Sequence, residues 1–197
     1  MKRKSVGVIV FFALAGRAFA LDPHPTLDRI PVCYNYSCAV RQVIGISQTD
    51  WGGVAGWFYP AATAAAQERE QIRHAIGWIE VLVGRQTPTH RDKGRNPYDV
   101  QWPGQLDCID ESLNTTTYLR LLQAEGLLKW HRVLDRVRRR TFVDQHWAGQ
   151  IEQINTGKRY VVDSWFLDNG TLPYVQKLDD WADVSMFSST YHYVPSE

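Results

Sequence analysis

The spacing of apolar residues changes near Gly126, and this change limits how the chain can fold. Upstream of Gly126, Ile72, Ile76, Ile79 and Val83 recur at helical spacing. Downstream of it, side chains of residues 128–133 alternate with a period of two, which is typical of a β-strand. Helices first and strands afterwards predict an α+β fold with an antiparallel sheet.

The spacing predicts helices over residues 63–83 and 108–125, with Gly84 and Gly126 as their end signals. It predicts strands at residues 128–133, 138–154 and 159–167, with a turn over residues 155–158. A short strand at 40–46 and a short helix at 177–184 are also expected. We therefore predict one domain, residues 61–197, preceded by an extended arm, residues 21–60.

The first twenty residues have the pattern of a secretory signal peptide. Lys2, Arg3 and Lys4 precede an apolar run over residues 6–16, and Ala18 and Ala20 form a small-residue cleavage site. The run is too short to span a membrane. We expect cleavage after residue 20, no stable membrane anchor in the mature chain, and a secreted or periplasmic location; an uncleaved anchor is the alternative.

Export affects the interpretation of the three cysteines. Cys33 and Cys38 are close enough in sequence to close a small disulfide loop in an oxidising compartment, although two reduced thiols are the alternative. Their pairing leaves Cys108 as the remaining thiol, and an unpaired thiol in a secreted chain is a candidate reactive group.

The charge of the chain gives no sign of a nucleic-acid partner. The formal net charge is +1, so no strong overall field attracts a polyanion. One basic cluster precedes the proposed histidine strand; either it holds an acidic substrate, or it protects an edge strand from pairing with another sheet. Its members are Arg132, Arg136, Arg138, Arg139 and Arg140.

Cys108 has the sequence context of a nucleophile. It follows Asp107, a favourable N-cap residue, so the thiol is expected at the positive end of the helix dipole, which favours the thiolate. His146 and Asp163 follow in two strand-like segments. A thiol, an imidazole base and an orienting carboxylate are the parts of a cysteine acyl-transfer site.

The order Cys108, His146, Asp163, with Asp107 and Asp110 around the cysteine, resembles the transglutaminase-like, papain-related superfamily. Within it, the bacterial transglutaminase-like cysteine proteinases are the most similar branch. The resemblance covers about residues 63–168. It implies a transglutaminase-like core, in which a central helix carrying the nucleophile packs on an antiparallel β-sheet. It also implies Cys108 as nucleophile, His146 as base and Asp163 as orienting acid.

The third residue of this triad is open. A tight turn centred on Thr156 and Gly157 would place His146 opposite Leu167, and so near Asp168 instead of Asp163. A longer loop, or a bulge for which Gly149 is a candidate, would bring Asp163 to His146. Asp168 is therefore the alternative third residue.

An acyl-transfer site also needs oxyanion donors. The Cys108 backbone N–H is one candidate, and Gln101, Trp102 and Gln105 are side-chain candidates for this role or for substrate contact.

No metal site and no cofactor are predicted, because the cysteines and histidines lack zinc-site spacing. The proteinase branch implies calcium near the nucleophile, for which Asp107, Asp110 and Glu111 could supply oxygens. Ile109 stands where that branch has an acidic residue, and helix capping is the alternative role of these carboxylates.

The sequence thus predicts an exported cysteine hydrolase or acyltransferase, a cysteine peptidase that cleaves an amide or peptide bond through a thioester. Its expected partner is a protein or peptide substrate. A non-catalytic protein-binding domain on the same scaffold and a peptidoglycan amidase are the alternatives. Hydrolysis versus transfer and the oligomeric state stay open.

Overall fold

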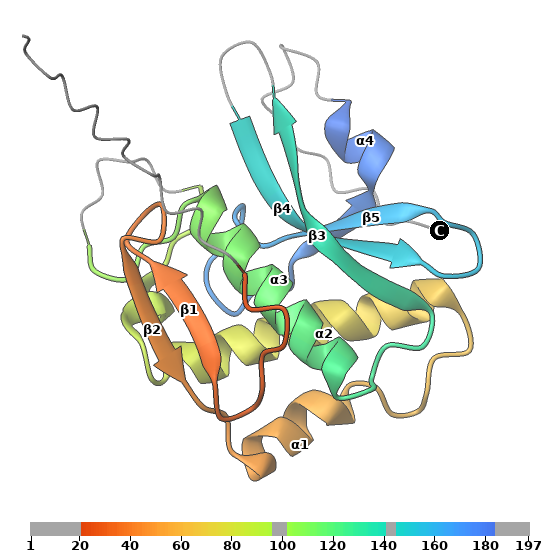
Figure 1. Cartoon of the computed structure of the whole chain (residues 1–197), viewed down its shortest axis with the longest axis horizontal. Coiled ribbons are helices and arrows are strands. Elements are labelled where there is room, and N and C mark those ends of the chain that lie inside the picture. Colours follow the sequence, from red (N-terminus) through yellow and green to blue (C-terminus); the bar gives the residue numbers. More distant parts are fainter. Residues whose placement is uncertain (1–20, 96–101, 141–144, 184–197) are drawn as a thin grey trace, which may run out of the picture.

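The computed structural model describes residues 21–95, 102–140 and 145–183. Helices surround and cross two antiparallel sheets (Figure 1). The helices are α1 (Gln48–Gly56), α2 (Ala65–Gly84), the short 3₁₀ helix η1 (Pro88–Arg91), α3 (Cys108–Ala124) and α4 (Leu178–Ala182). The strands are β1 (Ile30–Tyr34), β2 (Val40–Ile44), β3 (His131–Arg140), β4 (Gln145–Gln153), β5 (Arg159–Asp163) and β6 (Tyr174–Lys177).

The larger sheet has the strand order β3-β4-β5-β6, and each neighbouring pair is antiparallel. This mixture of helices with an antiparallel sheet is consistent with the predicted α+β class. Strand β6 had no counterpart in the predicted elements. Strand β3 begins in the predicted strand 128–133 and continues to Arg140, and β4 lies within the predicted strand 138–154. In the described ranges, no helix is both long enough and apolar enough to cross a membrane.

Helix α3 occupies the centre of the fold. It lies between the β1–β2 hairpin and the larger sheet, with α2 beside it (Figure 1). Leu119, Leu121 and Leu122 are fully buried, which explains why its apolar residues cover more than one face. The helix begins at Cys108, as predicted, because Asp107 caps it.

Residues 21–60 are more ordered than the extended arm that the sequence suggested. They form the β1–β2 hairpin and helix α1, which pack into the same core as α2 and α3. All five residues of β1 are buried, and a disulfide between Cys33 and Cys38 closes the turn of the hairpin. A strand that is buried on both faces shows no alternation of apolar and polar residues, so β1 has no period-two pattern by which it could be predicted.

The turn between β4 and β5 is longer than a tight two-residue turn. The Gln153 N–H donates to the Lys158 carbonyl at 2.8 Å, so residues 154–157 form the loop. The register pairs Gly149 with Val162, and its continuation places Ala148 opposite Asp163. His146 therefore lies two residues along the same face of β4, next to Asp163 and away from Asp168.

Strand β3 contains a bulge opposite Gly149. Leu134 pairs with Gln150 and Val137 pairs with Ala148, so Asp135 and Arg136 share the single position that faces Gly149. An added Cβ at Gly149 would lie 3.0 Å from the Thr115 methyl group of α3, which shows how closely the helix approaches the sheet here. The bulge thus forms where the sheet crosses the first half of α3.

Candidate active site

Cys108 is the first residue of α3, and its side chain is nearly covered, at 6% exposed. Its Sγ lies 4.0 Å from the carbonyl oxygen of Gln145, the residue directly before His146 in β4. The fold thus brings the thiol to the beginning of the histidine strand, although 37 residues separate the two in sequence. At this helix position the dipole favours a negative sulfur.

The His146 imidazole is bound to Asp163. His146 Nε2 lies 2.8 Å from Asp163 Oδ2, and both side chains are buried. Because a carboxylate accepts hydrogen bonds, this contact places a proton on Nε2 and leaves Nδ1 as the nitrogen able to accept the proton of a thiol. This is the tautomer that a cysteine–histidine site needs.

Trp181 is a further partner of Asp163 that the sequence analysis did not identify. Its indole N–H donates to Asp163 Oδ2 at 2.9 Å from helix α4. The rings of Trp165, Phe166 and Trp181 lie 5.0, 5.2 and 5.8 Å from the His146 ring between centroids. These rings exclude water from the pair and strengthen its hydrogen bond. Only the expected short helix near residue 181 hinted at an element there.

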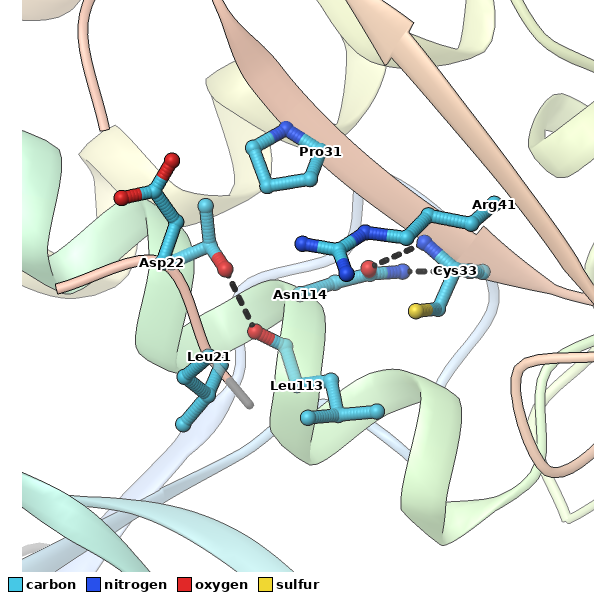
Figure 2. A pocket seen from close by; sticks show the side chains of 8 residues that line it. Leu21, Asp22, Pro31, Cys33, Arg41, Leu113 and Asn114 are labelled. Atoms are coloured by element: carbon cyan, nitrogen blue, oxygen red, sulfur yellow. Dashed lines mark hydrogen bonds between the residues drawn. The ribbon is translucent and has the colours of Figure 1, made fainter. Parts of the chain in front are cut away.

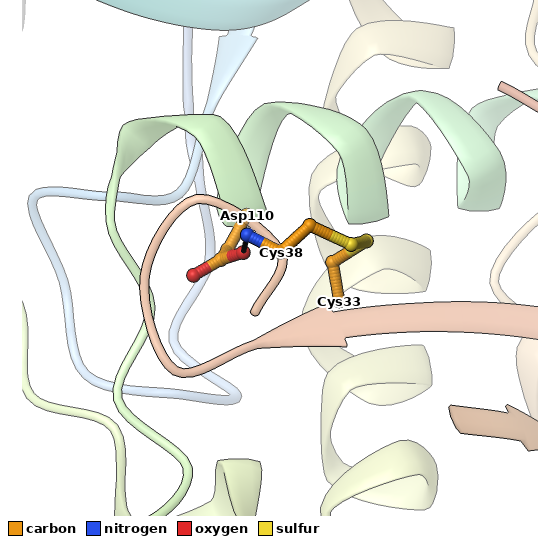
Figure 3. Close-up of side chains that lie close together, drawn as sticks. All are labelled: Cys33, Cys38 and Asp110. Atoms are coloured by element: carbon orange, nitrogen blue, oxygen red, sulfur yellow. Dashed lines mark hydrogen bonds between the residues drawn. A yellow bond between two sulfur atoms is a disulfide. The ribbon is translucent and has the colours of Figure 1, made fainter. Parts of the chain in front are cut away.

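The carboxylates on either side of Cys108 are held by backbone N–H groups. Asp107 Oδ1 accepts from the N–H groups of Ile109 and Asp110, and its Oδ2 accepts from the Ser37 N–H at 2.8 Å. Asp110 Oδ1 accepts from the Cys38 N–H at 2.6 Å, as Figure 3 shows, and its Oδ2 completes the capping box. The disulfide loop therefore fixes the end of the helix that carries Cys108.

The loop can do this because residues 35–38 all have positive φ, between 53° and 67°. Successive residues in this left-handed region direct their N–H groups to one side, which makes a concave donor surface for an anion. Such a conformation is costly for non-glycine residues. The disulfide and the two bound carboxylates maintain it.

Among the residues that the structure describes, Asp107 and Asp110 are poorly arranged to bind calcium. The oxygens of Asp107 and Asp110 already accept hydrogen bonds from N–H groups, and a cation bound to these oxygens would repel the N–H hydrogens. The two carboxylates therefore fit the role of helix capping better than that of metal ligands. Among the described residues, the single group with ligand atoms within 4.8 Å of one another is Cys33, Cys38 and Asp110. Its two sulfurs are joined in the disulfide and offer no thiolate (Figure 3).

Several carboxyl groups are buried beneath the start of α3. Burial raises the pKa of Glu80 to about 7 and that of Asp92 to about 8. Burial, with the charge of Asp107 adding to it, raises the pKa of Asp110 to about 7. Burial also raises the pKa of Glu111 well above its usual range, helped by the surrounding negative charges. This cluster holds protons near neutral pH.

The other predicted residues make their described contacts outside the His146–Asp163 pair or lie outside the described ranges. Asp168 forms a salt bridge with Lys93 at 2.6 Å, and its exposed carboxylate accepts from the Gly94 N–H, so it does not replace Asp163 beside His146. Gln105 donates to the Arg91 carbonyl and accepts from the Lys93 N–H, contacts that direct it to that loop. Trp102 is 69% exposed. Gln101 is not among the described residues.

A small pocket lies on the opposite side of α3 from Cys108. Leu113, Asn114 and Thr117 line it from the helix, together with Cys33 and Arg41 from the hairpin (Figure 2). These helix positions are rotated roughly 140–240° from Cys108 at about 100° per residue. Asn114 bridges to the Cys33 backbone at 2.8 Å in both directions, so the pocket belongs to the hairpin contact and not to the thiol site.

Comparisons with models of known protein families, with curated proteins and with solved structures gave no significant match. The assignment of chemistry therefore depends on the geometry of this chain alone.

Proposed function

We propose that the protein is an exported cysteine hydrolase or acyltransferase with a transglutaminase-like core, acting on an amide or peptide bond. The observation that supports this most is the buried His146–Asp163 pair, whose contact atoms are 2.8 Å apart. His146 lies on β4, and the carbonyl of the first residue of that strand, Gln145, contacts the Cys108 thiol. The order and the secondary structure of these residues agree with the resemblance noted from the sequence.

In the proposed reaction, His146 Nδ1 takes the thiol proton and the Cys108 thiolate attacks the substrate carbonyl carbon. The new C–S bond forms a tetrahedral intermediate, and its collapse breaks the C–N bond. The imidazolium gives its proton to the leaving amine. Water then hydrolyses the thioester, or a second amine takes the acyl group. Asp163 keeps the ring oriented and stabilises its cationic form.

A secreted or periplasmic location forms part of this proposal. The Cys33–Cys38 disulfide is compatible with an oxidising compartment, where such bonds persist. Its formation leaves Cys108 as the one cysteine of the three outside the disulfide, which makes selective labelling straightforward.

The central test is Cys108→Ala. We expect it to abolish cleavage of a mixed peptide library, measured by mass spectrometry, while the free energy of unfolding changes by about 1 kcal/mol or less. The matched labelling test is alkylation of the wild-type chain with iodoacetamide near pH 6, where an activated thiolate reacts quickly.

A large stability loss in Cys108→Ala, together with an inert wild-type thiol, would support the non-catalytic alternative, in which the cysteine fills the core. Cleavage of peptidoglycan fragments with no cleavage of linear peptides would support the amidase alternative.

A further inference from the structure

Arg136 lies in the β3 bulge, where it reaches the helix that carries Cys108. Asp135 and Arg136 are the two bulge residues, and the side chains of both contact α3. Asp135 binds Arg120, and Arg136 binds Ser112. Bulges of this kind redirect side chains and are frequent beside active sites. Arg136 is one of the five arginines in the basic cluster, and no sequence pattern distinguishes it from the other four.

The contacts of Arg136 place its guanidinium on the Cys108 side of α3. Its Nη1 donates to Ser112 Oγ at 3.3 Å, and the Ser112 hydroxyl donates in turn to the Ile109 carbonyl at 3.1 Å. Ser112 is four residues after Cys108, so the two share one helix face. The guanidinium also stacks on the Trp147 ring, 4.2 Å from its centroid, and Trp147 directly follows His146. Arg136 thus bridges the two elements that hold the thiol and the imidazole.

The electrostatic partners of Arg136 are unusual. In the described ranges, no carboxylate forms a salt bridge with it, although it is half-buried. Burial lowers the pKa of Arg136, and the negative forms of Cys108 and then Asp107 oppose this effect. A partly desolvated cation without a carboxylate partner is expected to favour a nearby anion.

The charges around Cys108 explain why such a cation matters. Acidic groups outnumber basic ones near the start of α3, and each of them disfavours a thiolate once it has lost its proton. The groups on the elements packed against this end of the helix are Asp107, Asp110 and Glu111 on α3, Glu80 on α2, Asp92 after η1, Asp163 on β5, His146 on β4 and Arg136 on β3. Without a further cation, the helix dipole alone would have to offset these negative charges whenever His146 is neutral.

We propose that Arg136 is a positioning residue for the reaction, the fixed counter-cation that stabilises the Cys108 thiolate. This inference rests on the proposed function and deepens it. The bulge, the Ser112 contact and the Trp147 stack hold the charge in place, so the thiolate forms at a lower pH than the imidazole and the helix dipole would achieve by themselves.

The test follows the rate of Cys108 alkylation by iodoacetamide, a neutral probe, from pH 4 to 9 in the intact, disulfide-bonded chain. We expect Arg136→Gln to raise the midpoint of the rate profile by about one pH unit, which is about a tenfold lower rate below the midpoint. Rates should converge at high pH. Arg136→Lys should restore part of the shift, because it keeps the charge but loses the planar stack.

Arg138→Gln is the matched control. Arg138 is on the same strand and lies over the same Trp147 ring, 5.4 Å from its centroid. Its substitution therefore removes one positive charge and one contact with that ring, as Arg136→Gln does. We expect its alkylation midpoint to equal that of the wild-type chain. Thermal unfolding of each variant verifies that the fold is retained.

A second probe, the anionic iodoacetate, separates thiolate stabilisation from anion recruitment. If Arg136→Gln lowers only the iodoacetate rate and leaves the iodoacetamide midpoint unchanged, Arg136 attracts anions and the proposal is wrong. An unchanged midpoint for both probes in a folded variant would also overturn it, while the proposed function would stand. A wild-type thiol that reacts only near the ordinary thiol pKa of about 8.5 would overturn both.

Discussion

Among the described residues, two buried histidine–carboxylate pairs occur, and they differ in what surrounds them. His146 contacts Asp163 at 2.8 Å, and His131 contacts Glu68 at 2.9 Å. All four side chains are at least nine-tenths buried. The contact distance and the burial therefore do not distinguish a candidate catalytic pair from a structural one.

The partners of the carboxylates do distinguish them. Glu68 accepts the backbone N–H groups of Lys129, Trp130 and His131, so it ties helix α2 to the start of β3. Arg69 donates to the remaining His131 nitrogen, Nε2, at 3.4 Å. A guanidinium only donates hydrogen bonds, so this nitrogen is occupied as an acceptor. The second pair is saturated with structural contacts.

The His146–Asp163 pair has the opposite arrangement. Its carboxylate is held by side chains, those of His146 and Trp181, and its strand begins beside a thiol instead of a guanidinium. Among the described residues, no hydrogen bond occupies His146 Nδ1, whereas Arg69 occupies Nε2 of His131. An imidazole nitrogen that is left open can accept a proton, and one that is held by an arginine cannot. The state of the second nitrogen therefore separates the candidate catalytic pair from the structural one.

Removing each imidazole in turn tests whether the His146 pair is catalytic and the His131 pair structural. His146→Ala should lower the rate of peptide cleavage about 10³-fold, since general acid–base catalysis contributes that order of magnitude. His131→Ala should instead lower the free energy of unfolding by about 3–5 kcal/mol, because it leaves the Glu68 carboxylate buried without its partner. Cleavage kinetics and chemical denaturation of both variants measure the two effects.

Two outcomes would contradict this assignment of roles to the two histidines. A folded His131→Ala variant with wild-type stability and no activity would move the candidate site to the Glu68 pair. Equal losses of stability in the two variants would remove the distinction between them.

The parts of this site that depend on local sequence could be predicted. Asp107 and the helical spacing after it place Cys108 at a helix start, and the change of period at Gly126 places His146 and Asp163 on strands. The choice between Asp163 and Asp168 could not be predicted, because it depends on a loop of residues 154–157 whose length has no unique sequence signal.

The contacts made by tertiary packing were also beyond prediction. Trp181 reaches Asp163 from α4, and Arg136 reaches α3 through a bulge; neither has a spacing relative to Cys108 that marks it. The order in residues 21–60 depends on β1, whose five buried residues show no alternation. Long-range packing decides all three features, and a single sequence does not encode them as local patterns.

A second prediction concerns pH, because the carboxyl groups of the two regions shift in opposite directions. Burial alone would raise the pKa of Glu68, but hydrogen bonds from His131 and the backbone lower it. Burial raises the pKa of Glu80, Asp92 and Asp110 to about 7, 8 and 7. Groups with raised values bind extra protons in the folded state, so they stabilise the fold at low pH and lose this contribution as pH rises through about 7–8.

We therefore expect the melting temperature to fall between pH 5.5 and 8.5, on the order of 5 °C or more. Asp92→Asn should flatten this slope, since the amide keeps an acceptor for the Leu106 N–H without a titrating proton. Glu68→Gln is the control: it lowers stability but should leave the slope above pH 6 unchanged, because the contribution of a lowered pKa is lost only in acid. A melting temperature that rises over this range would contradict the assignment of protons to the cluster.

The smallest expected effect concerns the hydrogen bond that Trp181 donates to the Asp163 carboxylate. Trp181→Phe removes the indole N–H that donates to Asp163 Oδ2 at 2.9 Å, while the His146 contact and most of the ring packing remain. The loss of one hydrogen bond to a charged group corresponds to roughly 1.5–3 kcal/mol. If part of that energy orients Asp163 for catalysis, kcat should fall about three- to tenfold with KM nearly unchanged, because the interaction lies outside the substrate contacts. Trp51→Phe, at a buried tryptophan of α1, is the matched control and should alter stability without altering kcat. Equal kinetics for both variants would mean that the Trp181 N–H serves the fold alone, as the backbone donors of Glu68 do in the second pair.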